Sequence, residues 1–158
     1  MRVEKIVIGL DEAMKAMQAI IEESKRIPGR PVAVAIVDDR GDLICVARED
    51  GVRKLCTDMA IKKAYTSAQW RRNTTTLEAF WKERPMIFTE LLPDYNIAGG
   101  GVVIIEPGID SGVDKQFKEA WYGGIGVAGR FTGEQDEALA KVGLKVLQKL
   151  LWPFKAQD

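Results

Sequence analysis

The chain has 158 residues, and its 46% apolar and 29% charged residues are the usage of an ordinary globular domain. Its 23 Lys and Arg balance 23 Asp and Glu, so no general attraction to phosphate backbones or anionic lipids is built in, and we expect neither nucleic acid nor membrane as a partner. The sequence contains no histidine, which excludes catalytic triads, histidine-ligated zinc and imidazole acid-base chemistry.

The length predicts one domain over residues 1–158, and the N-terminal pattern predicts a cytoplasmic protein. Residues 1–14 carry charges inside any apolar window, and no run approaches the roughly 20 apolar residues of a membrane span. Cys45 and Cys56 lie eleven positions apart without an export signal, which favours two free thiols over a disulfide. No ligand cluster surrounds them, so we expect no metal site.

The first segment of the chain predicts a helix followed by a hairpin. Apolar residues recur with helical spacing over residues 10–21, and Pro28-Gly29 ends this helix. A β-branched run over residues 32–37, a polar turn over 39–42 and an apolar segment over 43–46 then predict two paired strands.

The middle of the chain predicts two helices. Alanines and Ile61 share one side of a segment over residues 57–71, which indicates a helix. Thr75 and Glu78 have the form of a capping box that begins a second helix, and Pro85 limits it. The pattern over residues 86–96 favours no structure.

A second hairpin is expected after three consecutive glycines at 99–101. Branched residues over 102–105 predict a strand, and the return strand is expected over 120–128. The polar segment over 109–118 is longer than a tight turn needs, so we expect a protruding connection.

Thr132, with Gln135 three residues later, has the capping-box form of a last helix that ends near Pro153. The order is then helix, two strands, two helices, two strands and helix. Hairpins between helical segments favour an α+β fold, with helices packed on an antiparallel sheet, over a doubly wound parallel sheet.

Four motifs carry a family resemblance in their order along the chain: AVAIVDDRGDLICVAREDG, DMAIKKAYTSA, GGGVVI and GGIGVAGRFTGEQDEALAKVGL. Together they resemble the GlcG/HbpS family, which includes the C-terminal domain of PduO-type proteins, over residues 10–150. The resemblance implies a single GlcG/HbpS-like domain with a profilin-like fold, in which helices flank a central antiparallel sheet of about five strands. It also implies assembly into homo-oligomers.

For function, the resemblance implies a small-molecule-binding protein, since some members bind heme and others sit in operons for glycolate, diol or aromatic catabolism. Heme-binding members use histidine ligands, and this chain has none. The cofactor therefore stays open. The segment over 109–118 also exceeds the shorter turn of relatives, which affects any transfer of specificity. Other residues that could ligate a heme iron are the methionines, Tyr65, Tyr95, Tyr122, Cys45 and Cys56.

Lys63 occupies the lysine position of the family's K-A-x-T-A-like helix, and it is the candidate catalytic residue. A lysine among apolar neighbours could bind an anionic group, or act as a base or nucleophile when desolvation lowers its pKa. The alternative is a solvated helix lysine. Arg48 and Asp50 form an R-x-D-G turn, in which the guanidinium could hold a carboxylate or phosphate. An internal salt bridge between Arg48 and Asp50 is the alternative.

The glycines offer two further features. Gly99, Gly100 and Gly101 permit close approach of the backbone to a ligand and a positive φ, or they form a flexible strand entry. The later GxG pattern from Gly124 to Gly129 lacks the strand-helix context of a dinucleotide site, so we reject that site.

Glu134 and Asp136 fall in the first turn of the last helix, where they complement the helix dipole. We interpret both as capping residues.

The sequence therefore predicts a binding protein for a tetrapyrrole or an anionic catabolite, with a pocket near Arg48, Asp50, Lys63 and residues 99–101. The alternative is a cofactor-independent lyase, isomerase or hydrolase in which Lys63 or a carboxylate transfers the proton. A structural subunit without a pocket is a third reading, and whether the protein is an enzyme stays open. The tryptophans are expected in the core or an interface: Trp70, Trp81, Trp121 and Trp152.

Overall fold

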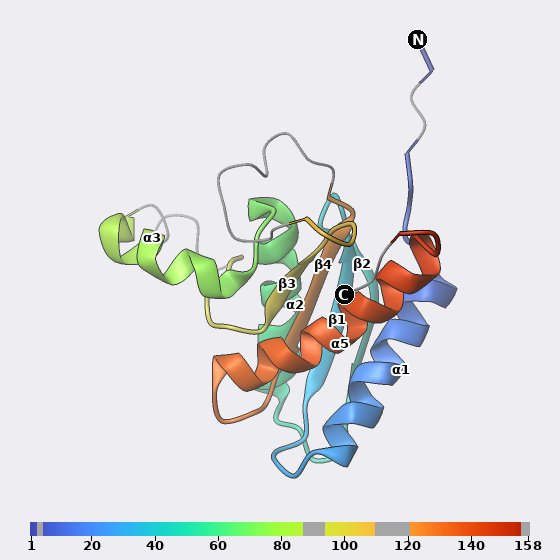
Figure 1. Ribbon diagram of the computed structural model, residues 1–158. Coiled ribbons are helices and arrows are strands. Elements are labelled where there is room, and N and C mark those ends of the chain that lie inside the picture. Colours follow the sequence, from blue (N-terminus) through green and yellow to red (C-terminus); the bar gives the residue numbers. More distant parts are fainter. Residues whose placement is uncertain (3–4, 87–93, 110–120, 156–158) are drawn as a thin grey trace.

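The structure, a computed structural model, describes residues 1–2, 5–86, 94–109 and 121–155. A four-stranded antiparallel sheet in the order β2-β1-β4-β3 forms its centre. Helix α2 covers one face, and α1 and α5 lie side by side on the other (Figure 1). The elements are α1 (Leu10–Arg26), β1 (Ala33–Asp38), β2 (Leu43–Arg48), α2 (Lys54–Trp70), the 3-10 helix η1 (Thr74–Thr76), α3 (Leu77–Glu83), β3 (Gly101–Ile104), β4 (Gly123–Ala128) and α5 (Gly133–Leu151).

Strand β1 shows why the sheet is covered on both faces. Successive side chains of a strand point to opposite faces. Val34 and Ile36 pack into the core with α1 and α5, whereas Ala33, Ala35 and Val37 pack against α2. A run that is apolar at every position therefore fits a strand buried between two helical layers.

Glycines in β4 bring α2 close to the sheet. A Cβ at Gly124 would lie 2.2 Å from the carbonyl oxygen of Ala64, and one at Gly126 would lie 1.9 Å from that of Ala60. Any side chain at these positions would push α2 away. The GxG pattern thus has a packing role here, which agrees with the rejection of a dinucleotide site.

The α+β class and the order of elements are confirmed, although several bounds differ. Helix α2 begins at Lys54, three residues before the predicted start. The capping box predicted at Thr75 is wrong: η1 precedes α3, and the Thr75 hydroxyl donates instead to Glu137 Oε1 at 2.7 Å. The capping box of the last helix is confirmed, because Thr132 Oγ1 accepts from Gln135 N and the Gln135 side chain accepts from Thr132 N.

The sheet has four strands within the described residues, where about five were expected. The return strand begins at Gly123, and the expected protruding connection over 109–118 lies almost wholly outside the described residues. Most of the ambiguous segment over 86–96 also lies outside them. Among the helices that the structure describes, none is long and apolar enough to cross a membrane.

Candidate functional site

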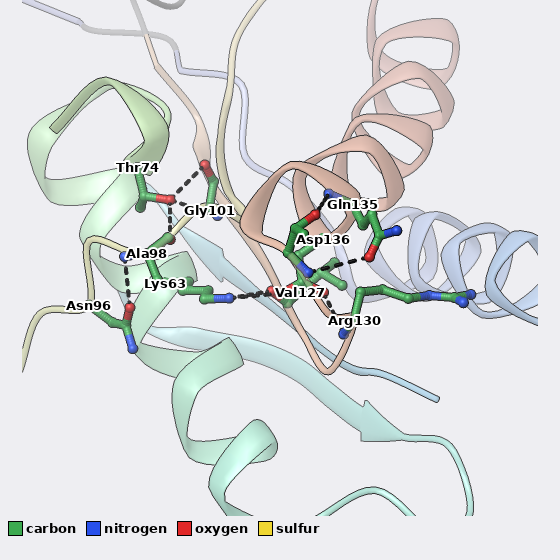
Figure 2. A network of polar contacts seen from close by, with 10 residues as sticks. Lys63, Thr74, Asn96, Ala98, Gly101, Val127, Arg130, Gln135 and Asp136 are labelled. Atoms are coloured by element: carbon green, nitrogen blue, oxygen red, sulfur yellow. Dashed lines mark hydrogen bonds and ion pairs between the residues drawn. The ribbon is translucent and has the colours of Figure 1, made fainter. Parts of the chain in front are cut away.

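Lys63, the candidate catalytic residue, is a buried member of α2, with only 2% of its surface exposed. Its Nζ donates to the backbone oxygen of Val127 in β4 at 3.0 Å and to Asp136 Oδ2 in α5 at 3.2 Å (Figure 2). The solvated-lysine alternative is therefore wrong. The amine thus links α2 and α5, which lie on opposite faces of the sheet, near the end of the inner strand β4.

Asp136 supplies the negative partner of this pair from the first turn of α5. Its Oδ1 accepts from the backbone N–H of Arg130 at 3.0 Å. Burial raises the pKa of Asp136 above its ordinary value, and the Lys63 charge and backbone N–H groups oppose that rise. Sequence reasoning assigned Asp136 only a role at the helix dipole, since no local pattern connects it with a lysine 73 residues away.

The glycine loop closes over the Lys63–Asp136 pair. Gly100 has a φ of 124°, and a Cβ there would lie 2.4 Å from the Val127 oxygen and 3.0 Å from Lys63 Nζ. A Cβ at Gly101 would lie 2.6 Å from the Lys63 carbonyl oxygen. The prediction that residues 99–101 lie beside Lys63 agrees with this geometry, and here close approach serves the packing of the chain on itself.

Arg48 and Asp50 do not join this cluster. Both are exposed, and Arg48 at the end of β2 pairs with Ala33 of β1, which pairs in turn with Ala128 of β4. Two strand spacings, or about 10 Å, thus separate Arg48 from the strand that accepts from Lys63. The ion pair considered between these two residues is not formed; Arg48 Nη1 donates instead to the carbonyl oxygen of Val52 at 3.1 Å. Their role in binding a ligand stays a prediction.

A groove of about 440 Å³ opens between α3, the loop before β3 and the first turn of α5; we call it the α3–α5 groove. At its base Gly99 and Gly133 touch, since a Cβ at Gly99 would lie 2.8 Å from the Gly133 backbone. Trp81 of α3, which was expected in the core or an interface, is 39% exposed and forms part of the wall. The described lining consists of Thr75, Glu78, Trp81, Ile97, Ala98, Gly99, Gly133 and Glu134.

The residues considered as heme ligands lie elsewhere. Cys45 and Cys56 are buried free thiols, and burial raises the pKa of Cys45. Burial, aided by a hydrogen bond of 3.0 Å to Glu106, raises the pKa of Tyr122 to about 12. Tyr65 and Tyr95 pack against each other with ring centroids 5.6 Å apart. None of these five residues belongs to the described lining of the α3–α5 groove.

These features define a small α+β protein with an antiparallel sheet, helices on both faces and a groove at a glycine-rich loop. The chain belongs to the family described as "Haem degrading protein HbpS-like", which matches residues 8–145. The resemblance found in the sequence is thereby confirmed. No curated protein sequence shows significant similarity to the chain.

Solved structures support the same family. A double mutant of HbpS from Streptomyces reticuli is 30% identical, with a TM-score of 0.77 over 92% of this chain and 90% of that one. A second HbpS structure is also 30% identical, with a TM-score of 0.75 over 92% of this chain and 94% of the other. A PduOC complex with heme, 21% identical over 89% and 95% of the two chains, shares the fold with a TM-score of 0.72.

Proposed function

We propose that this chain is a small-molecule-binding protein of the HbpS-like family that holds a planar aromatic ligand in the α3–α5 groove. The observation that carries the proposal is the position of Trp81, an exposed indole on the wall of a space of about 440 Å³. Small-molecule sites commonly enclose about 300–1,000 Å³. An open indole face offers a planar ring a stacking surface in such a space.

The charges of the groove narrow the class of ligand. Glu78 and Glu134, both exposed, are the charged residues of the described lining, which includes no lysine or arginine. Lys82, outside the described lining, forms an ion pair with Glu78 at 3.1 Å, so Glu134 is the carboxylate of the lining that has no ion pair with a described residue. This carboxylate raises the cost of placing a further carboxylate beside it. The groove therefore favours a neutral or cationic ring.

Heme is the group that the family points to, and the PduOC complex is a relative that holds it. The described lining of the α3–α5 groove contains no histidine, cysteine, tyrosine or methionine that could ligate the iron. The Glu134 carboxylate, which has no ion pair with a described residue, would also repel the propionates of heme. The residues present fit the planar ring but neither the iron nor the propionates, so we assign no iron-dependent step to this chain.

The enzymatic alternative has weaker support in the described geometry. Proton transfer or nucleophilic attack by Lys63 needs an amine that reaches a substrate. Here Nζ already donates to two acceptors, and Gly100 covers the pair. An anionic ligand held by Arg48 and Asp50, and homo-oligomeric assembly, stay predictions of the sequence and the family.

The experiment compares three planar probes: proflavine, a tricyclic cation; protoporphyrin IX; and hemin. We expect proflavine to bind with one-to-one stoichiometry, and Trp81→Ala to weaken its binding about 10-fold through loss of the stacking surface. Ala98→Trp should fill the groove and abolish binding. Phe154→Ala is the matched control, because Phe154 is a fully exposed aromatic residue outside the described lining.

Hemin should bind no more tightly than protoporphyrin IX, since no iron ligand lines the groove. Equal proflavine affinity in wild type and Trp81→Ala would contradict the proposed groove. A sharp, stoichiometric change in hemin absorbance that survives both Trp81→Ala and Ala98→Trp would place a tetrapyrrole at another site.

A further inference from the structure

Arg130, which follows β4, places a buried cation between α1 and α5. Its side chain is 9% exposed and runs toward α1 (Figure 2). Nη2 donates to the backbone oxygen of Ser24 at 2.6 Å, to Ser24 Oγ at 3.0 Å and to the backbone oxygen of Ile27 at 3.1 Å. All three acceptors are neutral. Among the residues that the structure describes, no carboxylate forms an ion pair with this guanidinium.

The other terminal nitrogen of Arg130, Nη1, has N–H groups that remain available to a ligand. Nη1 makes no hydrogen bond to a described residue, and it lies over Gly29, where a Cβ would come within 1.7 Å. Gly29 and Arg130 both line a groove of about 280 Å³ between the end of α1 and the start of α5, which we call the α1–α5 groove. The free N–H groups of a largely buried cation thus lie on the wall of an open space.

The rest of this groove is mostly apolar. Its walls include Ile27 and Pro28 after α1 and Leu139 and Val142 of α5. Glu23 is the acidic residue of the described lining, and Arg26 already holds its carboxylate through hydrogen bonds of 2.6 and 2.8 Å. The Ser24 hydroxyl links Nη2 to the Glu49 carboxylate, to which it donates at 2.7 Å, whereas Nη1 has no such link. Apolar walls with the free N–H groups of Nη1 suit a ligand that has a carboxylate at one end and a hydrocarbon body.

We propose that the α1–α5 groove binds a small organic monocarboxylate, with its carboxylate on Arg130 Nη1 and its apolar chain or ring between α1 and α5. Its space of about 280 Å³ suits a compact acid. This site shares no described lining residue with the α3–α5 groove. It is therefore independent of the planar-ligand proposal.

The test titrates the full chain calorimetrically with benzoate and hexanoate, and with their uncharged counterparts benzamide and hexanamide. Charge-assisted hydrogen bonds predict that each acid binds about 10- to 100-fold more tightly than its amide. Arg130→Met should weaken the acids by a similar factor while it keeps an apolar stem. Arg53→Met is the matched control, because it removes an exposed arginine outside the described lining of the groove.

Ala138→Trp gives a second route to the same answer. Ala138 is exposed and lines the groove, so an indole there should block the acids while Arg130 stays in place. It also decides the question if Arg130→Met does not fold. The proposal is overturned if acid and amide bind equally, if a folded Arg130→Met or Ala138→Trp binds the acids like wild type, or if neither acid binds at about 5 mM.

Discussion

Lys63 and Arg130 are the buried cations among the described residues, and they differ in the groups that surround their charges. Lys63 has a carboxylate partner in Asp136 and is closed in by Gly100. The guanidinium of Arg130 donates only to neutral oxygens, and the residue lines an open groove. The first arrangement neutralises the charge within the protein and joins three elements. The second leaves Nη1 without a described acceptor, and we propose that a ligand carboxylate takes this place.

Two acidic residues at the start of α5 differ in the same way. Asp136 points inward to Lys63, whereas Glu134, two residues earlier, is exposed on the α3–α5 groove. A buried ion pair needs both partners, because one alone is a desolvated charge. An exposed carboxylate keeps its hydration and stays available to shape the ligand site.

The largest expected effect comes from breaking the Lys63–Asp136 pair. Asp136→Ala should lower the free energy of unfolding by about 3–5 kcal/mol, because it leaves the Lys63 charge buried without a counterion. Urea unfolding followed by circular dichroism measures the loss. Asp58→Ala is the control, since it removes an exposed partner of Lys54 and should cost about 0.5 kcal/mol or less. A loss below about 1 kcal/mol for Asp136→Ala would contradict the assigned role of the pair.

Lys63→Met and Arg130→Met should differ in the free energy of unfolding that they lose, by less than the loss expected for Asp136→Ala. We expect Lys63→Met to cost about 3 kcal/mol, because the Asp136 carboxylate stays buried and unpaired. Arg130→Met should cost about 1 kcal/mol, because it leaves only neutral oxygens without their donor. The same urea series measures both variants. Equal losses would show that the two cations do not differ as the structure indicates.

The smallest effect on stability is expected at the partly buried carboxylate of Glu106, which accepts hydrogen bonds from Tyr122 and Lys155. Burial first, and then the Glu106 hydrogen bond, raise the pKa of Tyr122 to about 12, whereas an unfolded tyrosine titrates near 10. The unfolded chain thus loses its proton first, and stability should fall as pH rises from about 10 to about 12. Below that range, Tyr122→Phe should cost about 1 kcal/mol.

Urea unfolding across that pH range checks this prediction. Tyr122→Phe should show a shallower alkaline loss than wild type, since it cannot ionise. Glu106→Gln should show an intermediate slope, because burial of the phenol remains. Parallel curves for wild type and Tyr122→Phe would rule out this origin of the pH dependence.

Local patterns predicted most of the fold, because the interactions that form helices and hairpins join residues close in sequence. The last helix begins where Thr132 and Gln135, three residues apart, cap each other. The same reasoning failed at Thr75, whose hydroxyl found a partner in Glu137 instead. A capping pattern is therefore decisive only where no distant acceptor competes.

Trp81 and Arg130 show what the sequence left open in the candidate sites. Trp81 resembles any core aromatic in sequence, and its exposure depends on where α3 lies. Arg130 follows a glycine-rich strand and resembles a surface cation, yet its acceptor Ser24 is 106 residues away. No local signal marks either residue as a candidate for ligand binding.

The sequence by itself determined the α+β class, the order of elements, the family and the absence of imidazole chemistry. Each depends on residue type or on spacing within a few turns of chain. Only the tertiary structure decided that Lys63 is neutralised by Asp136, that the Arg130 guanidinium has no ion pair with a described carboxylate and that Trp81 faces a groove. Burial and charge pairing depend on which distant segments meet, and folding alone fixes those contacts.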